Sequence, residues 1–175
     1  MIQSANVIDA KLALSHLDVE EKQTAITGAS RDFFWYSPVL KSRLDHLVAD
    51  FLVRPKDEAE IIEILRVCYA HDVPVTTRGA GTGNYGQAMP MRGGCLLHLK
   101  HMDKVTHCEP GRVIVQPGCL LKDVDAYCIP ACGHELRMFS STWATATIGG
   151  FIAGGSGGVG SVTWGSLREL GNIIR

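Results

Sequence analysis

The sequence predicts an α+β protein in which a small parallel β-α-β layer is joined to a partly antiparallel sheet. An amphipathic helical pattern lies between two short apolar or β-branched stretches within residues 47–77, and a strand–helix–strand unit of this kind joins parallel strands. Two further short strands flank a turn at 109–112 and predict a hairpin. The chain has 175 residues, of which 46% are hydrophobic and 20% charged, which is typical of a globular protein.

Residues 1–46 are expected to form a helical and irregular segment before the main domain, residues 47–175. A weak helical pattern covers 5–16, and Asp18 is a typical N-cap for a second helix because acidic residues follow it. Residues 28–46 are expected to be irregular. Their aromatic side chains are expected to pack against the fold: Phe33, Phe34, Trp35 and Tyr36.

The parallel layer begins with a strand at 47–53, which Arg54-Pro55 ends. Asp57 is the expected N-cap of a helix that continues to about His71. A short strand at 73–77 follows. The chain then enters a glycine-rich stretch at the carboxyl end of this strand, where ligands of such sheets bind.

The second half of the chain is expected to begin with a strand at 95–99 and a hairpin formed by 104–108 and 113–116. A short helix at 120–128 should bury one stripe of side chains, namely Leu121, Val124 and Tyr127. Residues 134–139 are expected to be extended, and a second glycine-rich stretch and a polar tail follow.

Charge and cysteine usage exclude several classes of protein. The net charge of −1 provides no global positive field for nucleic acid or anionic lipid. We see no secretory signal within residues 1–30 and no membrane span, and the six cysteines form no C-x-x-C pair. We therefore expect a cytoplasmic protein with free thiols. Cys128-x3-Cys132-x-His134 resembles half of a zinc site, but no second half follows, so no metal is expected.

Two glycine clusters carry the functional signal: the first glycine cluster, residues 78–87, and the second glycine cluster, residues 147–160. Glycine allows positive φ angles and close approach to the backbone, and runs of backbone N–H groups form concave sites for anions. Two clusters in one small chain suggest a bound pyrophosphate and hence a nucleotide cofactor. The alternative is that the clusters are simple turns, with Arg78 pairing or capping within the protein instead of meeting phosphate.

Both clusters match the dinucleotide pattern G-x-G-x-x-G, at Gly81, Gly83 and Gly86 and again at Gly155, Gly157 and Gly160. That pattern requires a helix to begin within the glycines. Pro90 and the following glycine pair oppose a helix after the first match, and we expect no helix at 161–165 after the second. We therefore reject a nicotinamide dinucleotide site. A Walker A motif is absent.

Several segments, in order, resemble the FAD-binding domain of the vanillyl-alcohol oxidase / p-cresol methylhydroxylase (PCMH-type) flavoprotein superfamily. The matching segments are 53–61, 73–83, 115–118, 141–142, 147–150 and the turn that ends at Trp164-Gly165. The resemblance covers roughly residues 47–165. The run from Arg78 to Gly83 is most similar to the glycolate oxidase and D-lactate dehydrogenase-like branch.

The resemblance implies a PCMH-type fold with FAD lying between its two parts, and it implies two sets of binding residues. The first set comprises Arg78, Gly79, Ala80, Gly81, Thr82 and Gly83 around the pyrophosphate, with Asn84 and Gln87 near the exit of the loop. The second set lines the ribityl chain and pyrophosphate from the other side and comprises Ser141, Thr142, Thr147, Gly149 and Gly150. The first loop holds no His or Cys, so we expect FAD to be bound non-covalently there.

The implied function is the FAD-binding part of a flavin-dependent oxidoreductase that oxidises a small hydroxyl-bearing substrate and passes electrons to oxygen or a carrier. Such proteins continue beyond this point into a substrate-binding domain, so we expect the flavin domain to be incomplete at its C-terminus, and we assign no catalytic residue. The alternatives are a non-catalytic truncated fragment or a subunit completed by a separate chain. A homo-oligomer also remains open.

Overall fold

The computed structural model describes residues 4–155 and 157–167. The chain divides into two compact units, unit 1 (Met1–His101) and unit 2 (Met102–Arg175). Ser156 of the second glycine cluster and the expected polar tail at 168–175 lie outside the described residues.

Unit 1 contains a four-stranded sheet in the order β1-β2-β4-β3. The strands β2 (Phe51–Val53), β4 (Cys95–His98) and β3 (Val75–Arg78) are parallel, which confirms the predicted parallel layer. Strand β1 (Val19–Glu20) pairs antiparallel with β2. The strand β4 ends in a 3-10 turn, η2 (Leu99–His101).

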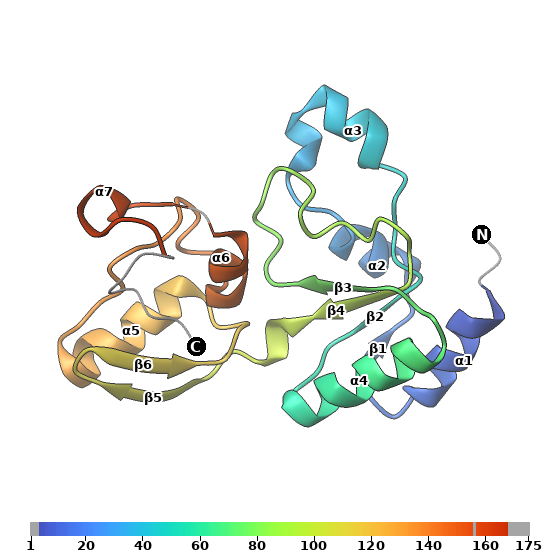
Figure 1. Ribbon diagram of the computed structural model, residues 1–175, viewed down its shortest axis with the longest axis horizontal. Coiled ribbons are helices and arrows are strands. Elements are labelled where there is room, and N and C mark those ends of the chain that lie inside the picture. Colours follow the sequence, from blue (N-terminus) through green and yellow to red (C-terminus); the bar gives the residue numbers. More distant parts are fainter. Residues whose placement is uncertain (1–3, 156, 168–175) are drawn as a thin grey trace. The chain divides into compact units, whose positions relative to one another are not determined.

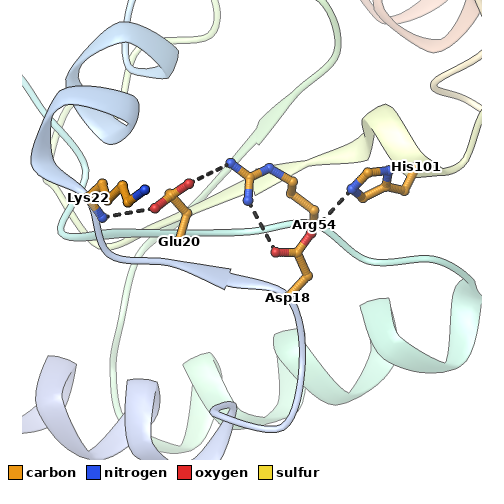
Figure 2. A network of polar contacts seen from close by, with 5 residues as sticks. All are labelled: Asp18, Glu20, Lys22, Arg54 and His101. Atoms are coloured by element: carbon orange, nitrogen blue, oxygen red, sulfur yellow. Dashed lines mark hydrogen bonds and ion pairs between the residues drawn. The ribbon is translucent and has the colours of Figure 1, made fainter.

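Strand β1 corrects the prediction that a helix begins at Asp18. Figure 2 shows the cause: Arg54 donates one hydrogen bond of 3.2 Å to Asp18 and another of 3.2 Å to Glu20, and His101 Nε2 lies 3.2 Å from Asp18 Oδ2. These two carboxylates therefore attach β1 to β2 and η2, and Glu20 also accepts a hydrogen bond of 3.0 Å from Lys22 N. The helix α2 (Gln23–Ala29) begins only after Lys22.

Helices cover both faces of this sheet (Figure 1). Side chains of α1 (Ala5–Ala13) and α4 (Glu58–Ala70) pack with Phe51, Val53, Cys95 and Leu97. The intervening residues Leu52 and Leu96 pack with Ile26 of α2. Alternate strand residues thus point to opposite faces, as a pleated strand requires.

The predicted helix after Asp57 is confirmed. The Asp57 carboxylate accepts a hydrogen bond of 2.9 Å from Glu60 N, and the helix α4 ends at its C-cap residue His71. Fewer side chains of α4 are buried than its apolar pattern in the sequence predicts. Only Ile64 and Cys68 are buried, and Tyr69 is 90% exposed.

Residues 28–46 are more regular than predicted. They contain η1 (Phe34–Tyr36) and α3 (Pro38–Leu44), and Ser37 caps α3 through a hydrogen bond of 3.4 Å from Leu40 N. Pro38 occupies the first turn, where its missing N–H costs nothing. Of the four aromatic side chains expected to pack, only Phe34 is buried, and Phe33, Trp35 and Tyr36 are exposed and contact one another.

Unit 2 contains the predicted hairpin, formed by β5 (Val105–Glu109) and β6 (Arg112–Val115). Helix α5 (Leu121–Cys132) packs on it through Val124 and Cys128 (Figure 1). The helix is one turn longer than predicted, and Tyr127, expected in the buried stripe, is 50% exposed. Within the described residues, 134–139 form only a single bridge, between Phe139 and Val159.

One helix lies within the second glycine cluster and another follows it directly, which corrects the expectation that residues 161–165 form no helix. Helix α6 (Ile148–Gly154) begins at its N-cap Thr147, and α7 (Ser161–Trp164) is a single turn after Gly160. The low helix propensity of glycine is overridden by the cap and by packing of Phe151 against Leu121 and Met138.

Candidate functional site

The first glycine cluster forms a loop at the carboxyl end of β3, as predicted. Gly81 and Gly86 have φ angles of 69° and 78°, a conformation that L side chains rarely adopt. The loop therefore depends on glycine at these two positions for its backbone path.

The Arg78 side chain lies beneath this loop and is only 8% exposed. Its guanidinium donates a hydrogen bond of 2.6 Å to Arg31 O and one of 3.4 Å to Ala80 O. A Cβ atom at Gly81 would clash with this guanidinium. Burial lowers the pKa of Arg78, while the nearby Asp32 carboxylate opposes that shift. The result is a buried cation directly behind the loop, hydrogen-bonded to backbone carbonyls.

Asp32 holds the same loop from the inside. Its buried carboxylate accepts hydrogen bonds of 2.8 Å from Phe34 N and 2.9 Å from Gly86 N. The adjacent Phe33 N donates a bond of 2.7 Å to Gly83 O. Residues 31–34 thus act as a support for the loop. Sequence reasoning missed Asp32, because its partner Gly86 is 54 positions away and no local pattern marks it.

Gln87, a predicted site residue, folds back into the loop. Its side-chain oxygen accepts a hydrogen bond of 3.2 Å from Tyr85 N, and a Cβ at Gly83 would lie 2.6 Å from that oxygen. The N–H groups of Tyr85 and Gly86 are therefore occupied by protein acceptors. Across residues 4–155 and 157–167, by contrast, the N–H groups of Gly81 and Gly83 have no hydrogen-bond acceptor.

His98 lies at the end of β4, beside the start of this loop. Burial, and then the positive charge of Arg78, lower the pKa of His98 to about 4, although a hydrogen bond with the Gly79 backbone partly opposes the shift. The imidazole is therefore neutral at pH 7, and Arg78 supplies the local positive charge.

In unit 2, the predicted residues Thr147, Gly149 and Gly150 form the start of α6. Thr147 Oγ1 accepts a hydrogen bond of 3.2 Å from Gly150 N, and Gly149 N donates one of 2.9 Å to Pro117 O. A Cβ at Gly149 would lie 2.7 Å from the Pro117 backbone oxygen. The backbone N–H groups of these two glycines therefore already have acceptors within the protein.

Ser141 and Thr142 lie in the turn just before α6. Thr142 O accepts hydrogen bonds from Thr145 N and Ala146 N, and the hydroxyls of Thr142 and Ser140 lie 3.1 Å apart. The Ser141 side chain is exposed. This turn is held by the buried residue Asp125 of α5, whose carboxylate accepts hydrogen bonds of 2.8 Å from Trp143 Nε1 and Leu136 N. Asp125 is a second supporting residue that the sequence did not reveal.

The geometry and the comparisons together define the class of protein. Residues 49–171 match the family model described as "FAD binding domain", and the chain belongs to that family. Its cofactor is FAD, and its fold is the PCMH-type fold that the resemblance implied.

Several curated relatives are named as oxidases or dehydrogenases. The chain is 32% identical over 122 residues to "Glycolate oxidase subunit GlcD" of Bacillus subtilis, covering 69% of this chain and 26% of the relative. It is 34% identical over 120 residues to "D-lactate dehydrogenase" of Archaeoglobus fulgidus, covering 67% and 26%, and 29% identical to the mitochondrial "D-2-hydroxyglutarate dehydrogenase" of Rattus norvegicus, covering 67% and 22%. The chain thus spans about a quarter of the length of these relatives.

Solved structures support the fold. An alkyldihydroxyacetonephosphate synthase superposes with a TM-score of 0.79 at 17% identity, covering 95% of this chain and 35% of that one. A p-cresol methylhydroxylase with bound substrate gives a TM-score of 0.64 at 19% identity, covering 84% and 28%. Among the described residues, no helix is both long and apolar enough to cross a membrane.

The residues of the first glycine cluster fit a diphosphate. The amides of Gly81 and Gly83 are donors that the described protein leaves unused, and the buried Arg78 cation lies behind them. Backbone donors backed by positive charge are the elements of an anion site. The structure therefore provides, in unit 1, the donor chemistry that a dinucleotide pyrophosphate requires.

Proposed function

We propose that this chain is the FAD-binding part of a flavin-dependent oxidoreductase that oxidises a small 2-hydroxy acid. The unused amides of Gly81 and Gly83 above the buried Arg78 carry the proposal. The substrate class is supported by the printed names of the relatives, which act on glycolate, D-lactate and D-2-hydroxyglutarate.

In this proposal the residues of the first loop bind the FAD diphosphate. Gly81 N and Gly83 N donate hydrogen bonds to phosphate oxygens, with Gly79, Ala80 and Thr82 completing the wall of the loop. Arg78 contributes its charge through the loop without leaving its carbonyl partners, and Gln87 and Asn84 lie at the exit. Electrostatic attraction from a buried cation is stronger than from an exposed one because water screens it less.

The residues of unit 2 are proposed to bind the same cofactor through side-chain hydroxyls. Ser141 and Thr142 can donate to ribityl or phosphate oxygens without adding charge. For Thr147, Gly149 and Gly150 we propose a supporting role, because their polar groups already form the start of α6. In this proposal Gly81 and Gly83 are the donors of backbone hydrogen bonds to FAD.

When bound, FAD supplies the hydride-accepting group, while the protein binds and orients it. We propose non-covalent binding at the first loop, because residues 79–87 contain no His or Cys to form a tether. No acid or base for the substrate is assigned to the described residues. The free thiols of the described residues support a cytoplasmic location.

The experiment is a titration of the purified chain with FAD, followed by flavin fluorescence and absorption. We expect saturable binding and full release of FAD on acid precipitation, since no covalent bond forms. Absence of binding at any accessible concentration would contradict the proposal. A second arm adds D-lactate or glycolate under anaerobic conditions: bleaching of the flavin would show that the chain reacts by itself, and a stable yellow complex would favour a non-catalytic domain or a subunit completed by another chain.

A further inference from the structure

Unit 2 contains a cluster of three thiols that the proposed function does not use. Cys108 of β5 and Cys132 of α5 have Sγ atoms 3.1 Å apart, and the Sγ atoms of Cys108 and Cys128 are 3.4 Å apart. Cys128 and Cys132 are four residues apart in α5, so they share one face of the helix. In the sequence, these two cysteines and His134 resemble half of a zinc site. In the structure, Cys108 of the hairpin lies beside the two cysteines, whereas His134 Nδ1 contacts the Cys132 carbonyl.

Access and geometry distinguish the three thiols. Cys108 and Cys132 are partly exposed, whereas Cys128 is buried. A disulfide has an S–S bond of about 2.0 Å, so the Cys108 and Cys132 sulfurs need to approach by only about 1 Å to form one. Within the described residues, no group of three or more His, Cys, Asp or Glu side chains is arranged to hold a metal ion.

From this geometry we propose that Cys108 and Cys132 form a reversible disulfide that joins β5 to the C-terminal end of α5, with Cys128 as the alternative partner of Cys108. The oxidant is of the peroxide class. One thiol reacts with hydrogen peroxide to give a sulfenic acid and water. The second thiol then attacks that sulfur: an S–S bond forms, the S–O bond breaks, and the hydroxide leaves with the proton of the attacking thiol as a second water. Two thiols are oxidised and one peroxide is reduced.

The bond would act where α5 is weakest. Pro130 lies inside the last turn of this helix and cannot donate a backbone hydrogen bond, and the helix ends at Gly133, whose φ is 71°. A link from Cys132 to Cys108 closes a loop of about 25 residues, which restricts the unfolded chain. The oxidised chain is therefore expected to resist heat better than the reduced chain, and a thiol reductant should reverse the effect.

The sequence makes the product easy to identify. Trypsin cleaves after Lys104, Arg112, Lys122 and Arg137, so Cys108 is released in the peptide 105–112, and Cys128 and Cys132 in the peptide 123–137. The other buried pair, Cys68 and Cys95, falls in the peptides 67–78 and 93–100. A mass spectrum of the non-reduced digest therefore separates a link between Cys108 and either Cys128 or Cys132 from links that involve the other cysteines.

The test treats the folded full chain with one equivalent of hydrogen peroxide. We expect the 105–112/123–137 linked peptide as the main product, an upward shift in Tm on the order of 5 °C, and reversal of both by dithiothreitol. The variant Cys108→Ser should lose the link and the shift, whereas Cys132→Ser should keep a link through Cys128. The matched control Cys119→Ala removes a buried thiol of the same unit outside the cluster and should oxidise like the parent chain.

Three results would overturn the proposal. The first is a folded chain whose linked peptide is absent after peroxide treatment. The second is a main product that joins 67–78 to 93–100. The third is stoichiometric binding of a soft metal ion by the three thiols when an ion such as Cd²⁺ is present in the buffer of the purified chain. If the bound ion protects the thiols from peroxide, they form a metal site.

Discussion

The two glycine clusters have similar composition, and the structure gives their amides different partners. In the first cluster, the N–H groups of Gly81 and Gly83 have no acceptor within the described protein, while Arg78, Asp32 and Gln87 hold the loop from the inside. In the second cluster, Gly149 N and Gly150 N donate to Pro117 O and Thr147 Oγ1. Glycine content alone therefore does not identify a binding loop, whereas the partner of each amide does.

The largest effect is expected at Gly81. The substitution Gly81→Val places a side chain against the Arg78 guanidinium at a φ of 69° and should weaken FAD binding by at least about 100-fold, as measured by fluorescence titration. The matched control is Gly111→Val, at a φ of 83° in the exposed hairpin turn where a Cβ would meet nothing within 4 Å. Equal affinities of the two variants for FAD would show that Gly81 is no more important for binding than a glycine outside the site.

A smaller effect is expected from the support beneath the loop. Asp32→Asn leaves only one carbonyl oxygen for two N–H groups, that of Phe34, which is buried, and that of Gly86, which is partly buried. An unsatisfied buried donor costs roughly 1–3 kcal/mol. The FAD dissociation constant should rise about 10-fold. Asp45→Asn is the control in the same segment, because Asp45 forms surface ion pairs with Arg31 and Lys41 that contribute little. An unchanged affinity for Asp32→Asn would show that the support is dispensable.

In the second cluster, Gly149→Ala should affect folding more than binding. Its Cβ would lie 2.7 Å from the Pro117 backbone oxygen, so urea unfolding should show a loss of roughly 2 kcal/mol. The adjacent Gly150→Ala contacts only the Thr147 hydroxyl, at 3.0 Å, and should change stability by less than about 1 kcal/mol. If Gly149→Ala instead abolished FAD binding in a chain of normal stability, its proposed supporting role would be wrong.

The pH dependence of stability sharpens the comparison in unit 1. The pKa of His98 is lowered to about 4 in the folded chain, against about 6.5 for an unperturbed histidine. Between these pH values the unfolded chain binds a proton that the folded chain does not, so stability falls as the pH drops from 6.5 to 4. We expect a loss on the order of 1–2 kcal/mol by urea unfolding, after allowance for partial exposure, and a flatter profile for His98→Gln. If the stability of His98→Gln depended on pH in the same way as that of the parent chain, groups other than His98 would cause the loss.

The elements that the sequence predicted are those with local causes. Asp57 caps α4 through a residue three positions away, and the hairpin turns at Gly111, whose positive φ is a local property. The family emerged from the order of several short segments along the chain. Local capping and turn chemistry are visible in sequence.

The features that the sequence did not predict depend on distant partners. The acidic residues at Asp18 and Glu20 form a strand edge because Arg54, more than 30 positions away, binds them. Asp32 supports a loop 54 positions away. The helix α6 forms from a glycine-rich segment because Pro117 and Cys119 accept hydrogen bonds from its first residues. Tertiary contacts of this kind override local propensity.

An amide NMR titration of the ¹⁵N-labelled chain with FAD shows directly which glycine N–H groups bind the diphosphate. We predict that the resonances of Gly81 and Gly83 shift strongly and downfield, because their N–H groups gain charged acceptors, while those of Gly149 and Gly150 keep their protein hydrogen bonds and move little. Saturation of the chain with FAD without a shift at Gly81 and Gly83 would contradict the assignment of the diphosphate to the first glycine cluster.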